Sequence, residues 1–411
     1  MPKDNLIVGL DVGTTKVSIC VGNFQEGIAN IIAACHKPNS GMRKGTVADI
    51  EETVSAISAA LDDAERTTGT SLSRAVVGIS GSHIVSTDSK GVIAVSRADG
   101  EITQSDVERV LEAARAIALP TNQEIIHVIP KNYIIDGQGG IKEPVGMSGI
   151  RLEVEAHVIG GTTSAIKNLS KCVFQAGLEI ADIVFSPLAT SKALLSKKQK
   201  EIGVLLVDFG AGTTSLAAYE EGEVIGAAVL PVGCMHITND IAIGLRTSLE
   251  TAEKIKIKEA TAAVNKVGEK EVVNLNDYDP ADDQKIPKKY LAQIVEARLD
   301  EIFNMIREKL RLWNKEGMLP AGIVFTGGGS KLNGLVDAAK EKLRLPAQVG
   351  SPFLEISGMV DKIDNPIYAT SVGLLLWAMQ QKTTSFTNTA GLKNIGNILD
   401  RTKNFFKQFL P

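Results

Sequence analysis

Two segments of the chain, half its length apart, repeat one pattern of apolar and polar positions. Residues 6–21 read as an apolar strand ending in Asp-x-Gly, a turn with Thr-Thr, and a second apolar strand. Residues 204–219 repeat this order, again with Asp-x-Gly before the turn. Asp11 and Asp208 are 208 − 11 = 197 residues apart in a chain of 411. Strands joined by glycine-containing turns form hairpins, so the pattern predicts two similar halves that each open with a hairpin.

The residue types in both turns suit phosphate binding. Glycine lets an anion approach the backbone closely, and successive N–H groups and threonine hydroxyls can donate hydrogen bonds to phosphate oxygens. Asp11 and Asp208, at the ends of the preceding strands, can hold Mg²⁺ through water, because this ion sheds its waters reluctantly. The simpler alternative is a pair of tight hairpins without a ligand. The predicted phosphate-binding residues are Gly13, Thr14, Thr15, Lys16, Gly210, Ala211, Gly212, Thr213 and Thr214.

A third glycine cluster follows the apolar strand 322–326. Gly327, Gly328 and Gly329 precede Ser330, Lys331 and a predicted helix. A strand, a glycine-rich turn and a helix also describe a Rossmann turn, but the G-x-G-x-x-G spacing is absent, as is the G-x-x-x-x-G-K-[ST] motif of a P-loop. Taken alone, the cluster is equally compatible with an ordinary structural turn.

Two helices in the second half carry polar candidates. One is predicted to begin at Ser248, an N-cap residue type, and it places Glu253 and Lys256 on one face at positions i and i+3. A longer helix covers residues 290–303, and Arg298 lies off its apolar stripe. Ordinary solvated positions are the simpler interpretation for these charged side chains.

The last segment predicts an amphipathic helix behind a polar linker. Residues 381–391 are rich in Thr, Ser and Asn and predict a flexible linker. At about 100° per residue, the apolar side chains of residues 392–411 fall within an arc of roughly 140°, and the charged ones lie opposite. Such helices lie on anionic membranes, although a helix packed on the core or in a partner's groove is the alternative. The predicted membrane-binding residues are Leu392, Ile395, Ile398, Leu399, Phe405, Phe406, Phe409, Leu410, Lys393, Arg401, Lys403 and Lys407.

Charge and cysteine usage narrow the class of protein. The chain carries a net charge of −4, and the tail carries 4 − 1 = +3, so the remainder carries −4 − 3 = −7. An acidic body disfavours nucleic acid as the principal partner. The four cysteines form no C-x-x-C pair, which argues against a zinc site or a disulfide framework. No apolar run reaches the 18 or so residues of a transmembrane helix, so the sequence predicts a soluble protein unless the tail attaches it to a membrane.

The two Asp-x-Gly hairpins and the late T-G-G-G turn resemble the actin/Hsp70/sugar-kinase ATPase superfamily. The segment 84–162, which ends in a half-exposed strand at 151–158, closely resembles the 1C subdomain of the FtsA family of bacterial division proteins. The resemblance implies an α/β fold of the duplicated actin-like (ribonuclease H-like) kind, with an interdomain nucleotide cleft. The implied units are subdomain 1A (1–83, 163–198 and the returning helix 366–380), subdomain 1C (84–162), subdomain 2A (199–233 and 313–365), subdomain 2B (234–312), the linker 381–391 and the membrane-targeting helix 392–411.

The resemblance also implies the ligands. The two hairpins would hold the phosphates of ATP or ADP with Mg²⁺, and the adenosine-binding residues would be Glu253, Lys256, Gly327, Gly328, Gly329, Ser330 and Lys331. Ser186 occupies the place where hydrolytic relatives carry Glu or Gln, and a serine hydroxyl positions water poorly. The resemblance therefore implies weak or negligible ATPase activity and no catalytic residue.

The partners implied by the resemblance are those of a division protein. They are the C-terminal peptide of FtsZ with Arg298 as a candidate contact, further copies of the chain in a polymer, an anionic membrane, and other division proteins bound through residues 84–162. The implied location is the cytoplasmic face of the cell membrane at the division site. The alternatives are a pilus-assembly adaptor resembling PilM and a small-molecule kinase of the same superfamily, although no carboxylate base beside a substrate pocket is apparent.

Overall fold

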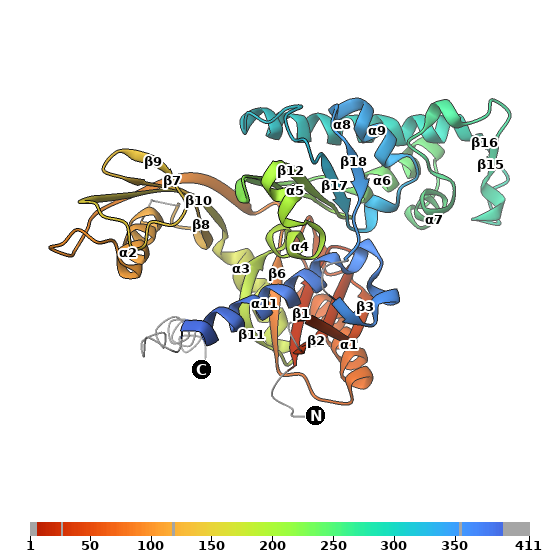
Figure 1. The fold of residues 1–411 in the computed structure, drawn as a ribbon. Helices are drawn as coiled ribbons and strands as arrows, with labels where there is room; N and C mark the ends of the chain where they lie inside the picture. Colours follow the sequence, from red (N-terminus) through yellow and green to blue (C-terminus); the bar gives the residue numbers. More distant parts are fainter. Residues whose placement is uncertain (1–5, 26–27, 117–119, 353–355, 389–411) are drawn as a thin grey trace.

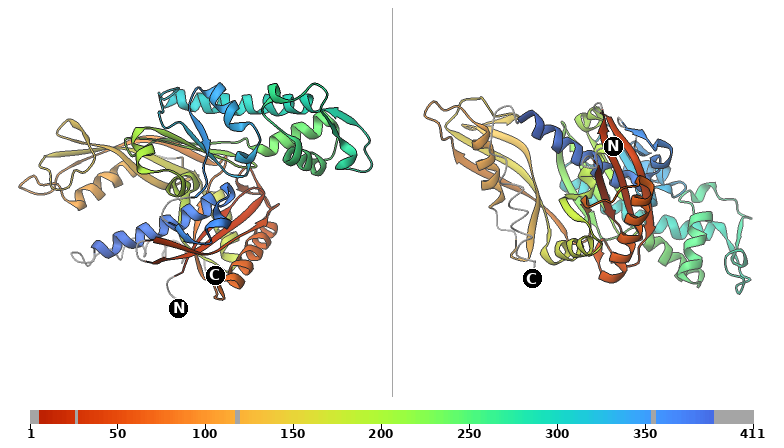
Figure 2. Two further views of the ribbon diagram at one scale, coloured as in Figure 1. Left: turned by 45° about the vertical axis from the view of Figure 1, so that its right-hand side comes forward. Right: turned by 90° about the horizontal axis from the view of Figure 1, so that it is seen from below.

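The computed structural model describes residues 6–25, 28–116, 120–352 and 356–388. Two α/β halves lie one above the other, and a separate module projects from one side of the first half (Figure 1). The helices and short strands that follow the second half's third strand project at the opposite side of the molecule, as both views of Figure 2 show. The two similar halves predicted from the repeated hairpins are therefore present, and both have the α/β composition that the resemblance implies.

The first half is built on a mixed sheet of six strands in the order β11-β6-β1-β2-β3-β19. The first three strands of the chain are antiparallel, and the others add in parallel. One face packs on α1 (Ile50–Thr68) and α3 (Thr163–Gln175), and the other packs on α4 (Ser186–Leu194) and α11 (Ala369–Asn388). The strands are β1 (Ile7–Val12), β2 (Lys16–Gln25), β3 (Ile28–Pro38), β6 (Arg74–Ile79), β11 (Glu179–Phe185) and β19 (Ile356–Gly358), with a small hairpin of β4 (Met42–Arg43) and β5 (Thr46–Val47).

The second half repeats this plan with five strands in the order β14-β13-β12-β17-β18. Its strands are β12 (Val204–Phe209), β13 (Thr214–Glu220), β14 (Glu223–Leu230), β17 (Ile323–Thr326) and β18 (Ala347–Val349). Its helices are α5 (Lys197–Ile202), α6 (Cys234–Leu245), α7 (Leu249–Glu259), α8 (Lys288–Leu312) and α9 (Leu335–Leu343). The short elements are η2 (Val264–Lys266), β15 (Val272–Asn274), η3 (Leu275–Asp277), β16 (Lys285–Pro287) and η4 (Gly328–Lys331), and α10 (Val360–Ile363) and η5 (Pro366–Tyr368) lead back to the first half.

The module is a four-stranded sheet with one helix across one face. Its strand order is β7-β10-β8-β9, with β7 (Ile84–Ala94), β8 (Gln123–Ile135), β9 (Gln138–Ile141) and β10 (Arg151–Thr162). The helix α2 (Gln104–Arg115) begins with a capping box of Thr103 and Asp106. Leu152, Val154 and Ala156 alternate along β10 and are fully buried in the cluster that α2 covers, as the period of two predicts.

Two predictions about the later part of the chain are wrong. The sequence assigns the segment 313–365 to the second half, but β19 pairs in parallel with β3 and completes the sheet of the first half. The linker predicted at 381–391 is helical over residues 381–388, because residues 381–390 contain no glycine or proline that would interrupt α11. The predicted membrane-targeting helix, 392–411, lies outside the described residues. Within the part of the chain that is described, no helix is both long and apolar enough to cross a bilayer.

Candidate functional site

A large cleft separates the two halves and is lined by both hairpin turns. Its volume is about 1250 Å³, somewhat above the usual range for small-molecule sites. The lining includes Asp11, Gly13, Thr14, Thr15 and Lys16 from the first half, and Asp208, Gly210, Ala211 and Thr213 from the second. Most residues predicted from the repeated pattern therefore meet in one place.

The two hairpin turns are closed in the same way. Gly13 donates its N–H to the carbonyl of Lys16 at 2.9 Å, and Gly210 donates to the carbonyl of Thr213 at 3.0 Å. Each turn follows a strand whose aspartate lines the cleft, and β1 pairs with β2 in the same register as β12 pairs with β13. The sequence repeat is thus a repeat of local geometry.

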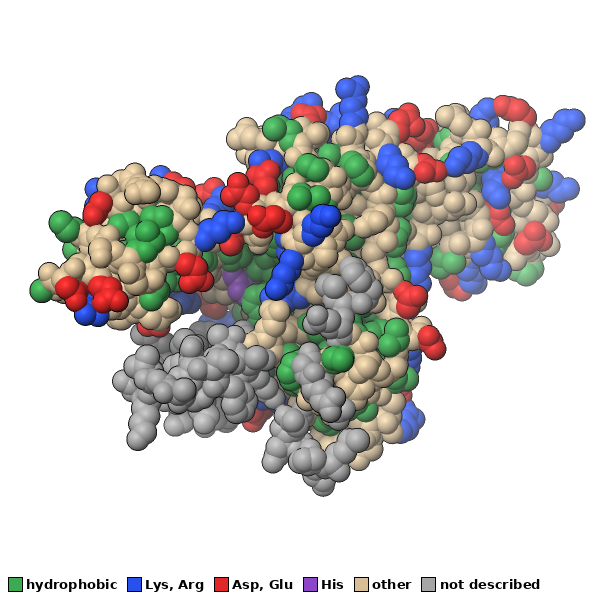
Figure 3. Space-filling model, in the orientation of Figure 1, with side chains coloured by type: hydrophobic (Ala, Val, Ile, Leu, Met, Phe, Trp, Pro, Cys, Tyr) green, Lys and Arg blue, Asp and Glu red, His purple; other side chains and the backbone are tan. Residues whose placement is uncertain are grey.

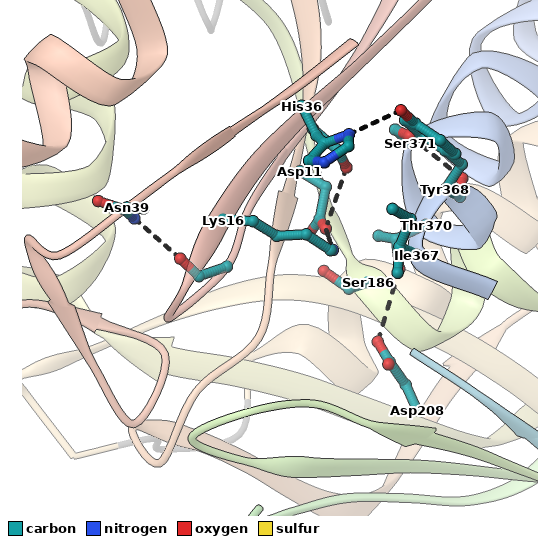
Figure 4. A network of polar contacts seen from close by, with 12 residues as sticks. Asp11, Lys16, His36, Asn39, Ser186, Asp208, Ile367, Tyr368, Thr370 and Ser371 are labelled. Carbon is teal, nitrogen blue, oxygen red and sulfur yellow. Dashed lines mark hydrogen bonds and ion pairs between the residues drawn. The ribbon is translucent and has the colours of Figure 1, made fainter. Parts of the chain in front are cut away.

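Two partly buried carboxylates, Asp11 and Asp208, lie near the ends of β1 and β12, in view together with Ser186 and Thr370 in Figure 4. Burial raises the pKa of Asp11, against the opposing effects of Lys16 and Ser18. Burial, and then the negative charge of Asp11, raise the pKa of Asp208 to about 6.

Among the described residues, both carboxylates have only distant partners. The Lys16 ammonium is 3.8 Å from the Asp11 carboxylate, and the hydroxyls of Ser18 and Thr370 are each 3.5 Å from Asp11 and Asp208 respectively. Contacts of this length neutralise a buried carboxylate poorly. An oxygen-rich pair of partly buried, poorly partnered carboxylates therefore fits a hard divalent cation such as Mg²⁺, which would favour the charged form of both.

The tips of the two turns approach each other across the cleft. A Cβ placed on Gly212 would lie 2.6 Å from the Thr14 hydroxyl oxygen, so Gly212 packs on the opposite turn and does not line the cleft. Thr214 is fully buried, and its hydroxyl donates to the carbonyl of Val232 at 2.8 Å. The prediction that the Thr214 side chain binds phosphate is therefore wrong, because the hydroxyl is used inside the second half.

The third glycine cluster forms the turn η4 beside Asp208. Gly327 has φ of +81°, and a Cβ there would lie 2.4 Å from Asp208 Oδ1. Glycine is thus required both by the backbone and by the neighbouring carboxylate. Ser330 is buried, and its hydroxyl donates to the Gly327 carbonyl at 2.7 Å, which holds the turn. The whole predicted run from Gly327 to Lys331 lines the cleft.

The helix α7, which Ser248 caps, also lines the cleft. The Ser248 side chain caps α7, as predicted, by accepting from the N–H of Thr251. The Lys256 ammonium is 2.6 Å from the Glu253 carboxylate and 2.8 Å from the Thr238 hydroxyl on α6. Both predicted side chains line the cleft, with Lys256 only 10% exposed.

Ser186 lies at the start of α4, and it lines the cleft with both aspartates. It is 3% exposed, and its hydroxyl oxygen would lie 2.9 Å from a Cβ placed on Gly78. A small hydroxyl therefore occupies the position predicted from the sequence, with no carboxylate or carboxamide in its place.

The sequence pattern does not predict several residues that line the cleft. Ser80, Ser215 and Thr370 each line the cleft through a hydroxyl-bearing side chain. A signal for Ser80 exists, because β6 lies parallel to β1 and the carboxyl ends of parallel strands meet at one edge of a sheet. Thr370, in the first turn of α11, is 162 residues from Asp208, and no local pattern connects the two.

Arg298 lies on α8, off the buried stripe, as the helical periodicity predicts. Its guanidinium contacts the Asp240 carboxylate at 2.6 and 2.9 Å and the Glu301 carboxylate at 2.6 Å. The hydrogen bond to Asp240 raises the pKa of Arg298. The guanidinium is thus already paired within the chain, and an acidic partner would have to share or displace these carboxylates.

Comparisons with known proteins agree with this architecture. A family described as "SHS2 domain inserted in FTSA" matches residues 81–160, and a family described as "Cell division protein FtsA" matches residues 205–373. The chain is 41% identical to the cell division protein FtsA of Pseudomonas aeruginosa, over 92% of the chain and 90% of that protein. It is 40% identical to the Bacillus subtilis protein (92% and 84%) and 35% identical to that of Escherichia coli K12 (90% and 89%).

Solved structures share the fold at low sequence identity. The PilM-PilN type IV pilus biogenesis complex matches with a TM-score of 0.66 and 17% identity, covering 92% of this chain and 99% of the matched one. MreB5 of Spiroplasma citri bound to ADP matches with a TM-score of 0.55 and 13% identity, covering 93% and 99%. These neighbours establish the actin-like fold, and the sequence relatives establish the family. The chain belongs to the FtsA family of actin-like cell division proteins.

Proposed function

We propose that this chain binds ATP or ADP with Mg²⁺ in the cleft and that it links FtsZ filaments to the membrane as a membrane-bound polymer. One observation carries the proposal: two matched turns face each other across a cleft that holds two partly buried, poorly partnered carboxylates. Groups of this kind suit a triphosphate and its metal, because the backbone supplies donors and the carboxylates supply charge.

Each part of the cleft has a task in this proposal. The first turn, through Thr14, Thr15 and Lys16, donates to phosphate oxygens from one side, and Ala211 and Thr213 donate from the other. Gly13 and Gly210 use their N–H groups to close the turns, and their lack of a side chain lets phosphate approach the backbone. Asp11 and Asp208 would hold Mg²⁺, since carboxylates repel phosphate but attract the cation that accompanies it. Bound Mg²⁺ would neutralise phosphate charge. Nucleotide binding is also supported by MreB5 of Spiroplasma citri, a protein of the same fold whose structure has been solved with ADP and with AMPPNP.

Adenosine would occupy the outer part of the cleft. The turn from Gly327 to Lys331 lies on one side, and the Glu253–Lys256 pair lies on the other. Because Ser186 stands in the place of the water-positioning group of hydrolytic relatives, the nucleotide would be turned over slowly. The nucleotide thus acts as a ligand that favours the closed cleft.

Membrane attachment is proposed from residues 392–411. Four basic residues against one acidic residue give this segment +3, and each basic residue near an anionic leaflet contributes about 1 kcal/mol. One such helix binds modestly. A polymer that presents one helix per subunit binds far more tightly through avidity.

Protein partners are proposed for both projecting ends. The module 84–162 would bind other division proteins, and the α8 side, with Arg298, would receive the acidic C-terminal peptide of FtsZ. Co-sedimentation of the full chain with phosphatidylglycerol-containing vesicles and FtsZ, with and without Mg-ATP, tests the whole proposal. We expect the chain to carry FtsZ to the vesicles, and we expect deletion of residues 392–411 to abolish this. Unchanged vesicle binding by the deletion variant would refute the anchor.

The rival functions predict different outcomes. A PilM-like adaptor would bind nucleotide but would not carry FtsZ to lipid. A small-molecule kinase would consume ATP when offered a glycerol-like substrate, and phosphorylated product would be detected by mass spectrometry. Neither outcome is expected here.

A further inference from the structure

A short segment, residues 80–86, joins the cleft to the base of the module. At its start, Ser80 lines the cleft, and at its end Ser86 lies in β7, outside the cleft lining. The Ser86 hydroxyl donates to the carbonyl of Ala227 at 2.6 Å, and Ala227 belongs to β14 in the second half. Ser80 also meets the second half, through the hydroxyl of Ser215. The segment therefore contacts the second half at both ends.

The module is attached to one half and packed against the other. Covalently, it leaves the first half after β6 and returns to it before α3. Its base nevertheless packs on the second half, because Ile159 of β10 and Ala227 of β14 are buried in the same cluster. The Lys142 ammonium also donates to the Glu221 carbonyl at 2.5 Å. Figure 3 shows acidic and basic side chains side by side on the face where the module meets the second half.

At its cleft end, the segment 80–86 contacts both halves near the hairpin turns. Ser80 Oγ is 2.7 Å from Ser215 Oγ in the second half. A Cβ on Gly45 would lie 2.2 Å from the Ser80 carbonyl oxygen, and the N–H of Gly45 donates to the Thr14 hydroxyl at 3.3 Å. A displacement of the first turn is therefore passed directly to the start of the segment.

We propose that the contacts of the module with the second half couple closure of the cleft around a nucleotide to the placement of the module. This rests on the proposed nucleotide binding. The module is joined covalently to the first half, so a rotation of the second half must either break the Ser86 and Lys142 contacts or carry the module with it. The two states of the cleft thus differ in contacts made far from the nucleotide, and this difference is what coupling requires.

Coupling of this kind is reciprocal. If the module contacts favour the closed cleft, removing one of them weakens nucleotide binding, although the altered residue touches no nucleotide. A single hydrogen bond of ordinary strength corresponds to about a two- to tenfold loss of affinity.

The test compares Ser86→Ala with Ser89→Ala in the full chain. Ser89 is a matched control on the same strand, because its hydroxyl donates to the Ala114 carbonyl at 2.6 Å inside the module. A second pair avoids the risk of a folding defect: Lys142→Ala removes the contact with Glu221, and Lys131→Ala removes an ion pair with Asp88 within the module. Mg-ATP affinity is measured by titration calorimetry, and hydrogen exchange of residues 84–94 and 223–230 is followed with and without Mg-ATP.

We expect Ser86→Ala and Lys142→Ala to weaken Mg-ATP binding about two- to tenfold and to reduce the ATP-dependent protection of both segments, and the two controls to match the wild type. Two outcomes would refute the coupling and leave the proposed function standing. In one, the wild type binds Mg-ATP and all four variants bind it equally well. In the other, the wild type binds Mg-ATP but the hydrogen exchange of neither segment changes. If the wild type does not bind Mg-ATP, the proposed function fails and the coupling fails with it.

Discussion

Ser80 and Ser215 come from different halves of the chain, and their hydroxyl oxygens lie 2.7 Å apart across the cleft. The repeat makes this contact informative. Ser18 is paired in register with Asp11, and Ser215 is paired in register with Asp208. In the first half the serine stays with its own aspartate at 3.5 Å, whereas in the second half it bonds across the cleft. The duplicated site is therefore asymmetric, with one serine serving as a bridge between the halves.

Replacing Ser215 with alanine removes this bridge. We expect Mg-ATP affinity to fall about two- to tenfold, since one hydrogen bond that favours the closed cleft is lost. Titration calorimetry measures the effect. Ser170→Ala is the control, because the Ser170 hydroxyl donates to the Ile166 carbonyl of its own helix. Equal affinities for the two variants would contradict a bridging role.

Asp208 makes the nucleotide-free protein sensitive to pH. Its pKa rises from 3.8 to about 6 on folding, so the folded state holds a proton that the unfolded state has released. Stability from this group is therefore lost as the pH rises through that window. Asp208→Asn removes the titration. We therefore expect the melting temperature of this variant, relative to that of the wild type, to be higher at about pH 7.5 than at about pH 5.

Thermal unfolding at the two pH values, without nucleotide, measures this difference. Asp63→Asn is the control, because the hydrogen bond with Lys37 lowers the pKa of Asp63, the opposite direction to Asp208. The effect of Asp63→Asn on stability should therefore be the same at both pH values. The same Asp208 variant should lose Mg²⁺-dependent ATP binding. A pH-independent difference between wild type and Asp208→Asn would rule out a raised pKa.

Gly327→Ala tests the close approach of the third turn to Asp208. The new methyl group meets Asp208 Oδ1 and the backbone, and the left-handed φ of +81° adds strain. We expect at least about a tenfold loss of Mg-ATP affinity, the range seen when groups that support a metal site move.

Gly317→Ala separates strain from the contact. Gly317 has φ of +68°, and among the described residues no heavy atom lies within 4 Å of where its Cβ would be. Denaturant unfolding should show a loss of about 1–2 kcal/mol from the backbone alone, with unchanged nucleotide affinity. If Gly317→Ala weakened Mg-ATP binding as much as Gly327→Ala, the contact with Asp208 would have no special role.

The cleft should turn over ATP slowly. Ser186 offers only a hydroxyl where a water-positioning carboxylate or carboxamide is needed, so we expect a rate well below about 1 s⁻¹ in a phosphate-release assay. Ser186→Ala should change this rate by less than about twofold, because serine contributes little as a base. Hydrolysis at several per second would overturn this assignment.

The repeated pattern predicts the part of the site that is local in sequence. Asp11, Asp208 and the turns that follow them are fixed by strands and hairpins a few residues long, and the structure brings them together. The same pattern misassigns Thr214, because its hydroxyl is taken by Val232, a residue 18 positions away. A motif gives residue types, whereas the partner of each hydroxyl depends on the packing of neighbouring strands.

Contacts between distant segments cannot be read from the sequence. Thr370 of α11 reaches Asp208, and Ser80 reaches Ser215, only because the two halves face each other across the cleft. The misplaced boundary at 365 has the same origin, since a three-residue edge strand such as β19 has too little periodicity to reveal its neighbour.

The position of β19 late in the sequence has a consequence for folding during synthesis. The sheet of the first half begins near the N-terminus, but one of its edge strands is Ile356–Gly358, and one of the helices packed on the sheet is α11. The strands of the second half, from β12 to β18, are continuous in the chain. A ribosome therefore releases everything the second sheet needs before it releases the last pieces of the first. The half that is translated first is the half that is completed last, because its edge stays uncovered until β19 and α11 have been made.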